Sequence, residues 1–267
     1  MRFARGESPD SRGYDMAVRF DLENGVAIIT IDRPEARNAI DGATASAVSE
    51  LIQRTNSDRD IRVAILTGSG GHFCAGMDLK AFLRGELMRL PNVGFAGVTQ
   101  ARISKPLIAA VEGYALAGGF EMALACDLVI AAENAQFGLT EVKRGLVANA
   151  GGLVRLPRQL PAKIASELVL TGDIVPASLL AHHGLINRVV PSGEALSTAL
   201  GCARKIAANG PLAVAVSKQV LSESQDWLST EMFERQYQLT APVFKSADAR
   251  EGASAFAEKR TPIWRGE

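Results

Sequence analysis

The chain has 267 residues, 47% of them hydrophobic, which is enough to bury the core of one large domain and excludes disorder for most of its length. Lysine plus arginine equals aspartate plus glutamate at 29 each, so no net charge attracts the chain to nucleic acid or to an anionic membrane. The cysteines, Cys74, Cys126 and Cys202, lie far apart without C-x-x-C spacing. We therefore expect reduced thiols in a cytoplasmic protein.

The N-terminal 15 residues mix charges of both signs and contain no apolar run. We expect a flexible leader there, not a secretory signal or a transit peptide. No stretch approaches the roughly 18 uninterrupted apolar residues that a transmembrane helix needs. The remaining pattern predicts a core over residues 16–200 and a C-terminal helical segment over residues 201–267, whose aromatic side chains favour burial by symmetric self-association.

The core begins with β structure. Residues 17–34 contain two apolar-rich runs around Asn24-Gly25, a dipeptide that supplies the positive φ angles of a tight hairpin turn. Residues 38–58 then have Asp41 as a helix N-cap and apolar residues at helical spacing, and residues 61–68 are typical of a short buried strand. The order is strand, helix, strand.

The same alternation continues along the chain. Residues 105–113 are strand-like, residues 118–126 begin a helix with two glycines, and residues 127–138 return to β structure. Such alternation indicates an α/β architecture with crossover helices. Beyond about Pro157 the last strand-like run is 186–190, and the other segments predict helices over residues 161–172, 193–210, 212–224 and 226–244.

Three segments contain residues that could do chemistry. The glycine-rich loop 68–80 precedes a helix start whose free N–H groups can hold an oxyanion, although its glycines could serve only to turn the chain. In the second segment Glu121 lies in the first turn of a helix, where the macrodipole favours negative charge, so it could be a purely structural carboxylate. In the third, Glu141 follows a β-like run, and either Thr140 or Glu141 could be only a helix cap.

Together, the order, spacing and contents of these segments resemble the enoyl-CoA hydratase/isomerase (crotonase) family. The resemblance covers roughly residues 16–264 and rests on these stretches: R-P-E-A-R-N-A-I, C-A-G-M-D-L-K, G-Y-A-L-A-G-G-F-E, C-D-L-V-I-A-A-E-N-A-Q-F-G and D-A-R-E-G-A-S-A-F-A-E-K-R. It implies an α/β fold in which repeated ββα units form a spiral and helices follow at the C-terminus. It also implies homotrimers, or hexamers made of two trimers.

The resemblance further implies roles for single residues. The oxyanion hole falls on the backbone N–H groups of Met77 and Gly118, and the catalytic carboxylates on Glu121 and Glu141. Glu141 corresponds to the proton donor to the α-carbon, and Glu121 to its partner in holding and activating water. Contacts to coenzyme A map to eight positions, the last two serving a neighbouring subunit's ligand: Glu35, Ala36, Arg37, Ala75, Asp78, Leu79, Phe244 and Lys259.

We therefore predict a 2-enoyl-CoA hydratase, a hydro-lyase of lipid metabolism that adds water in syn fashion to an acyl-CoA thioester. Two N–H donors would polarise the thioester carbonyl, and two carboxylates in unequal protonation states would move the protons. Alternatives are an enoyl-CoA isomerase, which can work with one carboxylate, a dehydratase for a carnitinyl or steroid-type acyl group, and a non-catalytic acyl-CoA-binding protein. We expect no metal and no cofactor, because coenzyme A is part of the substrate.

The sequence departs from the family pattern beside Glu141. Ala148 and Leu153 stand where the family carries a proline and a small hydroxyl residue, so we expect a different wall of the acyl chamber. Lys143 and Arg144 would favour an ionised Glu141 only if they point inward. Residues 81–104 have the composition of a mobile lid over the acyl pocket.

Several other residues fit simpler roles. The histidines lack metal-ligand spacing and are expected at the surface: His72, His182 and His183. Cys74 has no histidine placed by sequence to activate it, and we expect a small packed residue. Three cations on amphipathic helices predict solvated faces: Arg204, Lys205 and Lys218.

Overall fold

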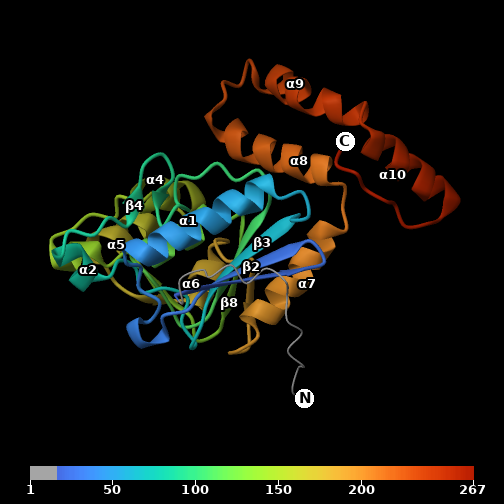
Figure 1. Cartoon of the computed structure of the whole chain (residues 1–267). Coiled ribbons are helices and arrows are strands. Elements are labelled where there is room, and N and C mark those ends of the chain that lie inside the picture. Colours follow the sequence, from blue (N-terminus) through green and yellow to red (C-terminus); the bar gives the residue numbers. More distant parts are fainter. Residues whose placement is uncertain (1–16) are drawn as a thin grey trace, which may run out of the picture.

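A computed structural model describes residues 17–267, so the predicted leader lies outside the described residues (Figure 1). The chain enters the fold through the predicted hairpin of β1 (Val18–Glu23) and β2 (Val26–Ile31), which pair antiparallel. Asn24 and Gly25 have φ angles of 51° and 80°, as a two-residue turn of this hand requires. The hairpin is confirmed.

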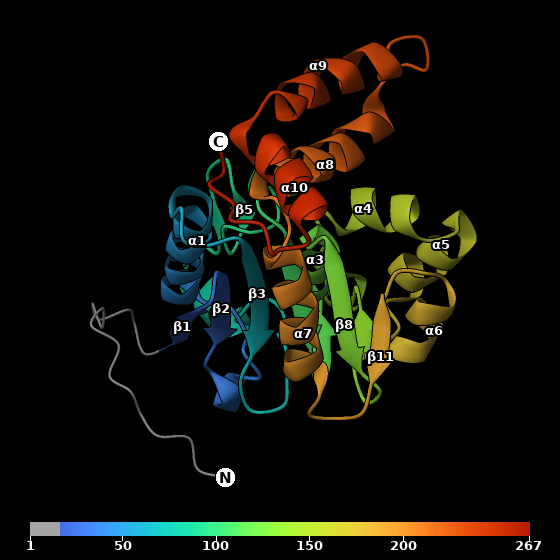
Figure 2. The same cartoon turned by 90° about the vertical axis from the view of Figure 1, so that its right-hand side faces the viewer.

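The main sheet has six strands in the order β1-β2-β3-β6-β8-β11, and every pairing after the hairpin is parallel. The later strands are β3 (Val63–Gly68), β6 (Leu107–Val111), β8 (Leu128–Ala132) and β11 (Arg188–Val190). The strands β3 and β6 are almost wholly buried because both faces of the sheet are covered, which explains their continuous apolar sequences (Figure 2).

A second layer of short strands lies beside the main sheet. Its strands are β7 (Tyr114–Leu116), β9 (Gln136–Gly138) and β10 (Val175–Pro176). Parallel bridges from Cys74 to Ala115 and from Ile40 to Met77 continue this layer into the earlier turns. Each turn adds a long strand, a short extended segment and a helix, the helices being α1 (Gly42–Ser57), α2 (Leu79–Leu83) and α3 (Gly118–Ala125). The fold is the predicted crotonase-like α/β spiral of ββα units.

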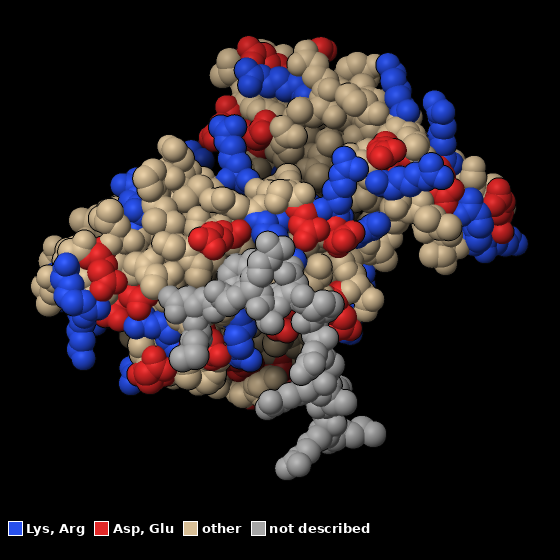
Figure 3. All heavy atoms as spheres, in the orientation of Figure 1, with Lys and Arg blue, Asp and Glu red and all other residues tan. Residues whose placement is uncertain are grey.

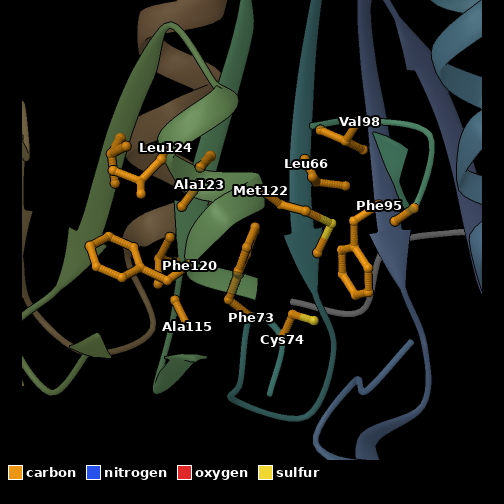
Figure 4. Packing of buried hydrophobic residues seen from close by; sticks show 14 of the residues in the cluster. Leu66, Phe73, Cys74, Phe95, Val98, Ala115, Phe120, Met122, Ala123 and Leu124 are labelled. Atoms are coloured by element: carbon orange, nitrogen blue, oxygen red, sulfur yellow. The ribbon is translucent and has the colours of Figure 1, made fainter. Parts of the chain in front are cut away.

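The core lies between the main sheet, the second layer, α1 and α3. Figure 4 shows side chains of β3, α3 and the segment around Phe95 converging on this cluster. The opposite face of the sheet is covered by α7 (Ala195–Ala207), whose buried stripe is Ala195, Ala199 and Ala203. Small side chains four residues apart let this helix approach the sheet closely. The predicted boundary between residues 200 and 201 therefore falls inside a helix that packs on the core.

Further helices complete the chain: α4 (Gly152–Gln159), α5 (Ala162–Thr171), α6 (Ala177–His182), α8 (Pro211–Glu223), α9 (Met232–Phe244) and α10 (Ala247–Glu258). The last three extend away from the core (Figure 1). Neither α8 nor α9 has a buried residue, and apolar side chains are exposed on this segment at Leu228, Phe233, Tyr237, Phe244 and Phe256. The helix predicted over residues 226–244 begins at Met232, because a short 3₁₀ turn and a loop precede it.

The expectation of a solvated face is wrong for Lys218. Its side chain is 18% exposed, and its Nζ donates to Asp127 Oδ2 at 2.7 Å and to the Lys105 carbonyl at 2.8 Å. This ion pair fastens α8 to the segments that lead into β6 and β8. Arg204 does face solvent, where it pairs with Glu23 at 3.4 Å.

Charges of both signs are interspersed over the face of the molecule shown in Figure 3, as the balanced composition predicts. Among residues 17–267, no helix combines the length and the apolar character needed to cross a membrane.

Candidate active site

The glycine-rich loop after β3 is held in place by Asn38. This side chain is fully buried, and its amide nitrogen donates to the carbonyls of Ser69 at 2.9 Å and His72 at 2.6 Å. Its Oδ1 accepts the backbone N–H of Arg33 at 2.9 Å. Because one amide satisfies groups on two loops, residues 33–38 and 69–72 form a single rigid unit.

The loop then runs directly beneath the start of α3. Cys74 donates its backbone N–H to the Tyr114 carbonyl at 2.8 Å and accepts from Leu116 N–H at 2.9 Å. Gly76 has φ 93°, and a Cβ there would lie 2.9 Å from the Leu116 carbonyl oxygen and 3.2 Å from Gly118 N. Glycine is therefore required at position 76, because the two backbones touch.

Two backbone N–H groups meet at this contact. Met77 lies between the bonds Ile40 N–H to Gly76 O and Asp78 N–H to Ile40 O, and its own N–H is not used by them. Gly118 is the first residue of α3, where the helix leaves N–H groups without internal partners. In the part of the chain that the structure describes, neither N–H donates to a protein acceptor. This arrangement suits a developing oxyanion.

Glu121 lies in the first turn of α3 and is only 3% exposed. Its Oε1 accepts the backbone N–H of Gly152 at 2.8 Å, so the carboxyl group meets the N-terminus of α4. Burial raises the pKa of Glu121 to about 7, and the charge of Glu141 adds to this. The N–H groups of Gly152 and Ala150 and the charge of Arg155 act in the opposite direction.

Glu141 begins the 3₁₀ turn Glu141–Arg144 after β9. Its Oε2 is buried and has no hydrogen-bond partner, which is rare for a carboxylate oxygen in a folded protein. Burial raises the pKa of Glu141, while its own backbone N–H and the charge of Arg144 lower it. Lys143 contributes nothing inward, because its Nζ pairs with Asp173 at 2.9 Å on the surface.

The two glutamates thus form a coupled pair in a poorly solvated site. Each has a raised pKa, and the proximity of Glu141 contributes to that of Glu121. Burial and like charge both disfavour ionisation of two such carboxyl groups at the same time. One acid and one base can then act side by side.

An apolar wall closes the site above Gly118. A Cβ on Gly118 would lie 2.6 Å from the Phe95 ring, and one on Gly152 would lie 2.9 Å from Leu139. Phe95 belongs to the small hairpin of β4 (Arg89–Leu90) and β5 (Gly94–Phe95), and Phe95 and Val98 are both almost fully buried. The lid predicted over residues 81–104 is therefore packed into the core over much of its length, and its exposed apolar part lies around Leu83 and Leu87.

Comparison with known proteins shows the family to which the chain belongs. The family model described as "Enoyl-CoA hydratase/isomerase" matches residues 21–267. The chain belongs to the enoyl-CoA hydratase/isomerase family. It is 43% identical over 242 residues to enoyl-CoA hydratase EchA19 of Mycobacterium tuberculosis, covering 88% of this chain and 91% of that protein. It is 42% identical over 249 residues to a carnitinyl-CoA dehydratase of Salmonella enteritidis, covering 89% and 94%.

Solved structures lead to the same family. The crystal structure of an enoyl-CoA hydratase from Mycobacterium tuberculosis superposes with a TM-score of 0.93 at 50% identity, covering 95% of this chain and 100% of that one. A carnitinyl-CoA hydratase from Mycobacterium avium superposes with a TM-score of 0.76 at 48% identity, covering 95% and 100%. These values establish the crotonase fold over nearly the whole chain.

Six of the coenzyme A contacts expected from the family lie together. Glu35 and Ala36 belong to the 3₁₀ turn Pro34–Ala36, and the Arg37 carbonyl accepts the Ala75 N–H at 3.0 Å. The Arg37 guanidinium lies 5.4 Å from the centroid of the Tyr114 ring. Leu79, the first residue of α2, is 41% exposed. Ala75, Asp78 and Leu79 belong to the glycine-rich loop, and the Arg37 carbonyl joins the turn Pro34–Ala36 to it.

Asp78, one of these residues, also stabilises the local structure. Its Oδ1 caps α2 by accepting from Lys80 N–H at 3.0 Å, and its Oδ2 accepts from Arg33 at 3.1 Å. Phe244 and Lys259 are elsewhere, on the C-terminal helical segment, with Phe244 82% exposed and Lys259 ending α10. The roles of these residues toward coenzyme A stay predictions.

The remaining candidates have ordinary surroundings. Cys74 is fully buried, and burial raises the pKa of its thiol to about 12, as expected for a packed residue. His182, the last residue of α6, is exposed, as expected. His72 and His183 are half-buried, and His72 stacks on Tyr114 at 4.8 Å, so neither lies fully at the surface. No group of three or more His, Cys, Asp and Glu side chains within residues 17–267 is arranged to hold a metal ion.

Three residues of the site were missed by the sequence interpretation. The buried amide of Asn38 holds the glycine-rich loop, and the backbone N–H of Gly152 donates to Glu121. Arg155 is half-buried and donates to the Thr99 carbonyl. Asn38 lies in the stretch R-P-E-A-R-N-A-I, and Gly152 and Arg155 lie in a stretch noted only for its departures. A glycine pair at the start of a helix was the signal that could have found Gly152.

Proposed function

We propose that this chain is a 2-enoyl-CoA hydratase, a hydro-lyase that adds water to an acyl-CoA thioester. The observation that carries the proposal is the buried pair Glu121 and Glu141 beside two free backbone N–H groups. Family membership supplies the substrate class, an acyl-CoA thioester. The paired carboxyl groups supply the means of adding or removing water.

The thioester carbonyl accepts hydrogen bonds from the N–H groups of Met77 and Gly118. Negative charge grows on this oxygen as water adds to the β-carbon, and each preorganised donor lowers the barrier by about 2.7–4 kcal/mol. Both donors belong to backbone fixed by neighbouring strands, so they need no rearrangement when the charge develops. Polarisation of the carbonyl makes the β-carbon electrophilic.

Glu121 and Glu141 move the protons. Glu121 holds the water and takes a proton from it as the new C–O bond forms at the β-carbon. Glu141 delivers its proton to the α-carbon, where the electron pair of the C=C bond accumulates. Oε1 of Glu121 is occupied by Gly152 N–H, so Oε2 faces the water. The unpartnered Oε2 of Glu141 is the oxygen available to the substrate.

Replacement of each glutamate by glutamine tests the mechanism. Gln keeps the size of Glu and removes proton transfer, so Glu121→Gln and Glu141→Gln each lower kcat on crotonyl-CoA at least about a hundredfold with KM little changed. The double variant falls much less than the product of the two losses, because the pair acts as a unit. Glu167→Gln, on the exposed face of α5, is the control. Full turnover in both single variants would refute the mechanism.

Isomerisation is the first alternative, since it can proceed with one carboxylate. If Glu121→Gln abolishes hydration but still isomerises a 3-enoyl-CoA, the chain is an isomerase with incidental hydratase activity. No turnover of any enoyl-CoA by the wild-type chain would instead indicate a non-catalytic acyl-CoA-binding protein.

A carnitinyl-CoA dehydratase is the second alternative, favoured by relatives of that name at 42% identity. The wall beside Gly118 and Gly152 is formed by Phe95 and Leu139. An apolar wall fits an uncharged acyl chain, and an aromatic face also binds a quaternary ammonium group, so the wall does not separate the two substrates. A panel of enoyl-CoA thioesters of rising chain length, with carnitinyl-CoA included, distinguishes the two. The loss or gain of the conjugated-thioester absorbance measures each reaction.

Three further expectations belong to this proposal. The reaction changes no oxidation state, so no metal or redox cofactor is required of the chain's own residues. Homotrimers, or hexamers of two trimers, would cover the apolar side chains of α9. A cytoplasmic location in fatty-acid metabolism fits reduced thiols and a thioester substrate.

A further inference from the structure

We infer that Arg155 is a positioning residue for Glu121: its guanidinium ties the start of α4 to the wall of the site and supplies a positive charge toward the buried Glu121 carboxyl group. This inference rests on the proposed function. It adds a residue that acts through Glu121 without touching the substrate.

The first part of the argument is the path of contacts. Arg155 lies in the first turn of α4, whose initial N–H group, that of Gly152, binds Glu121. Its side chain folds back over the helix start, because a Cβ on Gly151 would lie 2.0 Å from Arg155 Nη1. Nη2 donates to the carbonyl of Thr99, a fully buried residue.

The path continues from Thr99 to the oxyanion hole. Thr99 Oγ1 accepts the backbone N–H of Phe95 at 2.9 Å, which fixes the small hairpin. The Phe95 ring in turn lies directly against Gly118. Arg155 thus links α4, whose first N–H group binds Glu121, to the Phe95 segment. That segment covers Gly118, one of the two proposed oxyanion donors.

The second part of the argument is charge. Glu121 faces Glu141, Arg155 and the N-terminus of α4. Arg155 faces Glu121 and Cys126, whose thiol is neutral because burial raises its pKa. Arg144 acts on Glu141 from the other side of the pair. Arg155 is therefore the cation that favours the ionised form of Glu121.

Packing alone does not account for a guanidinium at this place. Arg155 is half-buried, and no carboxylate within residues 17–267 lies within ion-pair distance of it. Burying a charge without an ion pair disfavours folding, and a neutral side chain would fill the same space without that cost. Arg158, three residues on, is exposed and pairs with Asp226 at 3.3 Å. The hydrogen bond to Thr99 needs a donor but no charge, and the carboxyl group on which the charge acts is that of Glu121.

Four variants separate charge from packing. Arg155→Lys keeps the charge, Arg155→Gln keeps an N–H donor without the charge, and Arg155→Met keeps the apolar stem alone. Arg158→Gln is the matched control on the same helix. Circular dichroism identifies the folded variants, and two neutral variants are made so that one folded neutral protein suffices. The pH dependence of kcat/KM on crotonyl-CoA is measured for each.

Removal of the Arg155 charge should move the acid limb of the kcat/KM profile to higher pH by about one unit. A nearby opposite charge lowers the pKa of a carboxyl group by about one unit or more, so its loss raises the pKa of Glu121. The rate at the optimum should fall by less than about tenfold. Arg155→Lys should keep the wild-type limb, and Arg158→Gln should match the wild type throughout. The inference would be overturned if folded Arg155→Gln or Arg155→Met kept the acid limb of the wild type. It would also be overturned if Arg155→Lys moved the acid limb as far as the neutral variants do.

A second readout does not depend on turnover. Infrared titration of protein labelled with ¹³C-glutamate follows the protonated carboxyl band of Glu121, identified by its loss in Glu121→Gln. The midpoint pH of this band should rise in Arg155→Gln and Arg155→Met, and it should keep the wild-type value in Arg158→Gln. If the wild type hydrates nothing but this midpoint moves, the proposed function fails and the role of Arg155 stands. An unmoved midpoint contradicts that role whatever the activity.

Discussion

Glu121→Gln should stabilise the folded protein while it lowers activity, and the size of the gain in stability follows from burial. The pKa of Glu121 rises from an ordinary 4.5 to about 7 in the folded chain, so folding opposes ionisation of this group. The unfavourable contribution appears as the pH rises from 4.5 to 7 and is complete above 7. It amounts to about 3 kcal/mol, since each pH unit between the two values corresponds to about 1.36 kcal/mol.

Glutamine carries no charge and its carbonyl oxygen can still accept the Gly152 N–H. At pH 8 the variant should therefore unfold at a temperature higher by about 6 °C, given about 2 °C for each kcal/mol in a chain of this size. At pH 5 the difference should nearly disappear, because the wild-type carboxyl group is then protonated. Differential scanning calorimetry at both pH values, with exposed Glu167→Gln as control, measures this. If Glu121→Gln were no more stable than the wild type at pH 8, burial would not disfavour ionisation of Glu121, and the reasoning would be refuted.

Three further predictions address other parts of the molecule. Lys218→Met should lower the free energy of unfolding in urea by about 1 kcal/mol, because Asp127 and the Lys105 carbonyl lose a half-buried partner. Arg204→Met should change it by less than about 0.5 kcal/mol, and equal effects would contradict the different burial of the two cations. Sedimentation should show trimers or hexamers, and a monomer at micromolar concentration would leave Phe244 and Lys259 without a cross-subunit role. Hydratase activity should survive EDTA, and loss that a divalent ion restores would overturn the site.

The elements of the fold could be predicted where local pattern and tertiary structure agree. Asn24-Gly25 forms the hairpin turn, and Asp41 caps α1 by accepting the Thr44 N–H at 2.8 Å, both as expected. Apolar runs become β3 and β6 because parallel strands with both faces covered need no polar face. The short second layer could not be predicted, since bridges such as Cys74 to Ala115 join segments forty residues apart and leave no periodicity.

The site divides in the same way. Its four central residues, Met77, Gly118, Glu121 and Glu141, were predicted from a family resemblance, and local chemistry alone left structural alternatives open for each segment. The supporting residues were missed because their partners are distant in sequence: Arg155 reaches Thr99, and Lys218 reaches Asp127. A cation on an amphipathic helix has the same local pattern whether it faces solvent or a buried acceptor.

The contact of Gly76 with Leu116 and Gly118 has a consequence for how this scaffold changes over time. The two proposed oxyanion donors belong to the main chain, so most substitutions leave them in place, while added volume at Gly76 or Gly118 displaces them. The carboxyl groups, by contrast, are single side chains that one codon change can remove or convert. A lineage can therefore exchange its acid and base, and with them its reaction, while it keeps the ability to stabilise a thioester enolate.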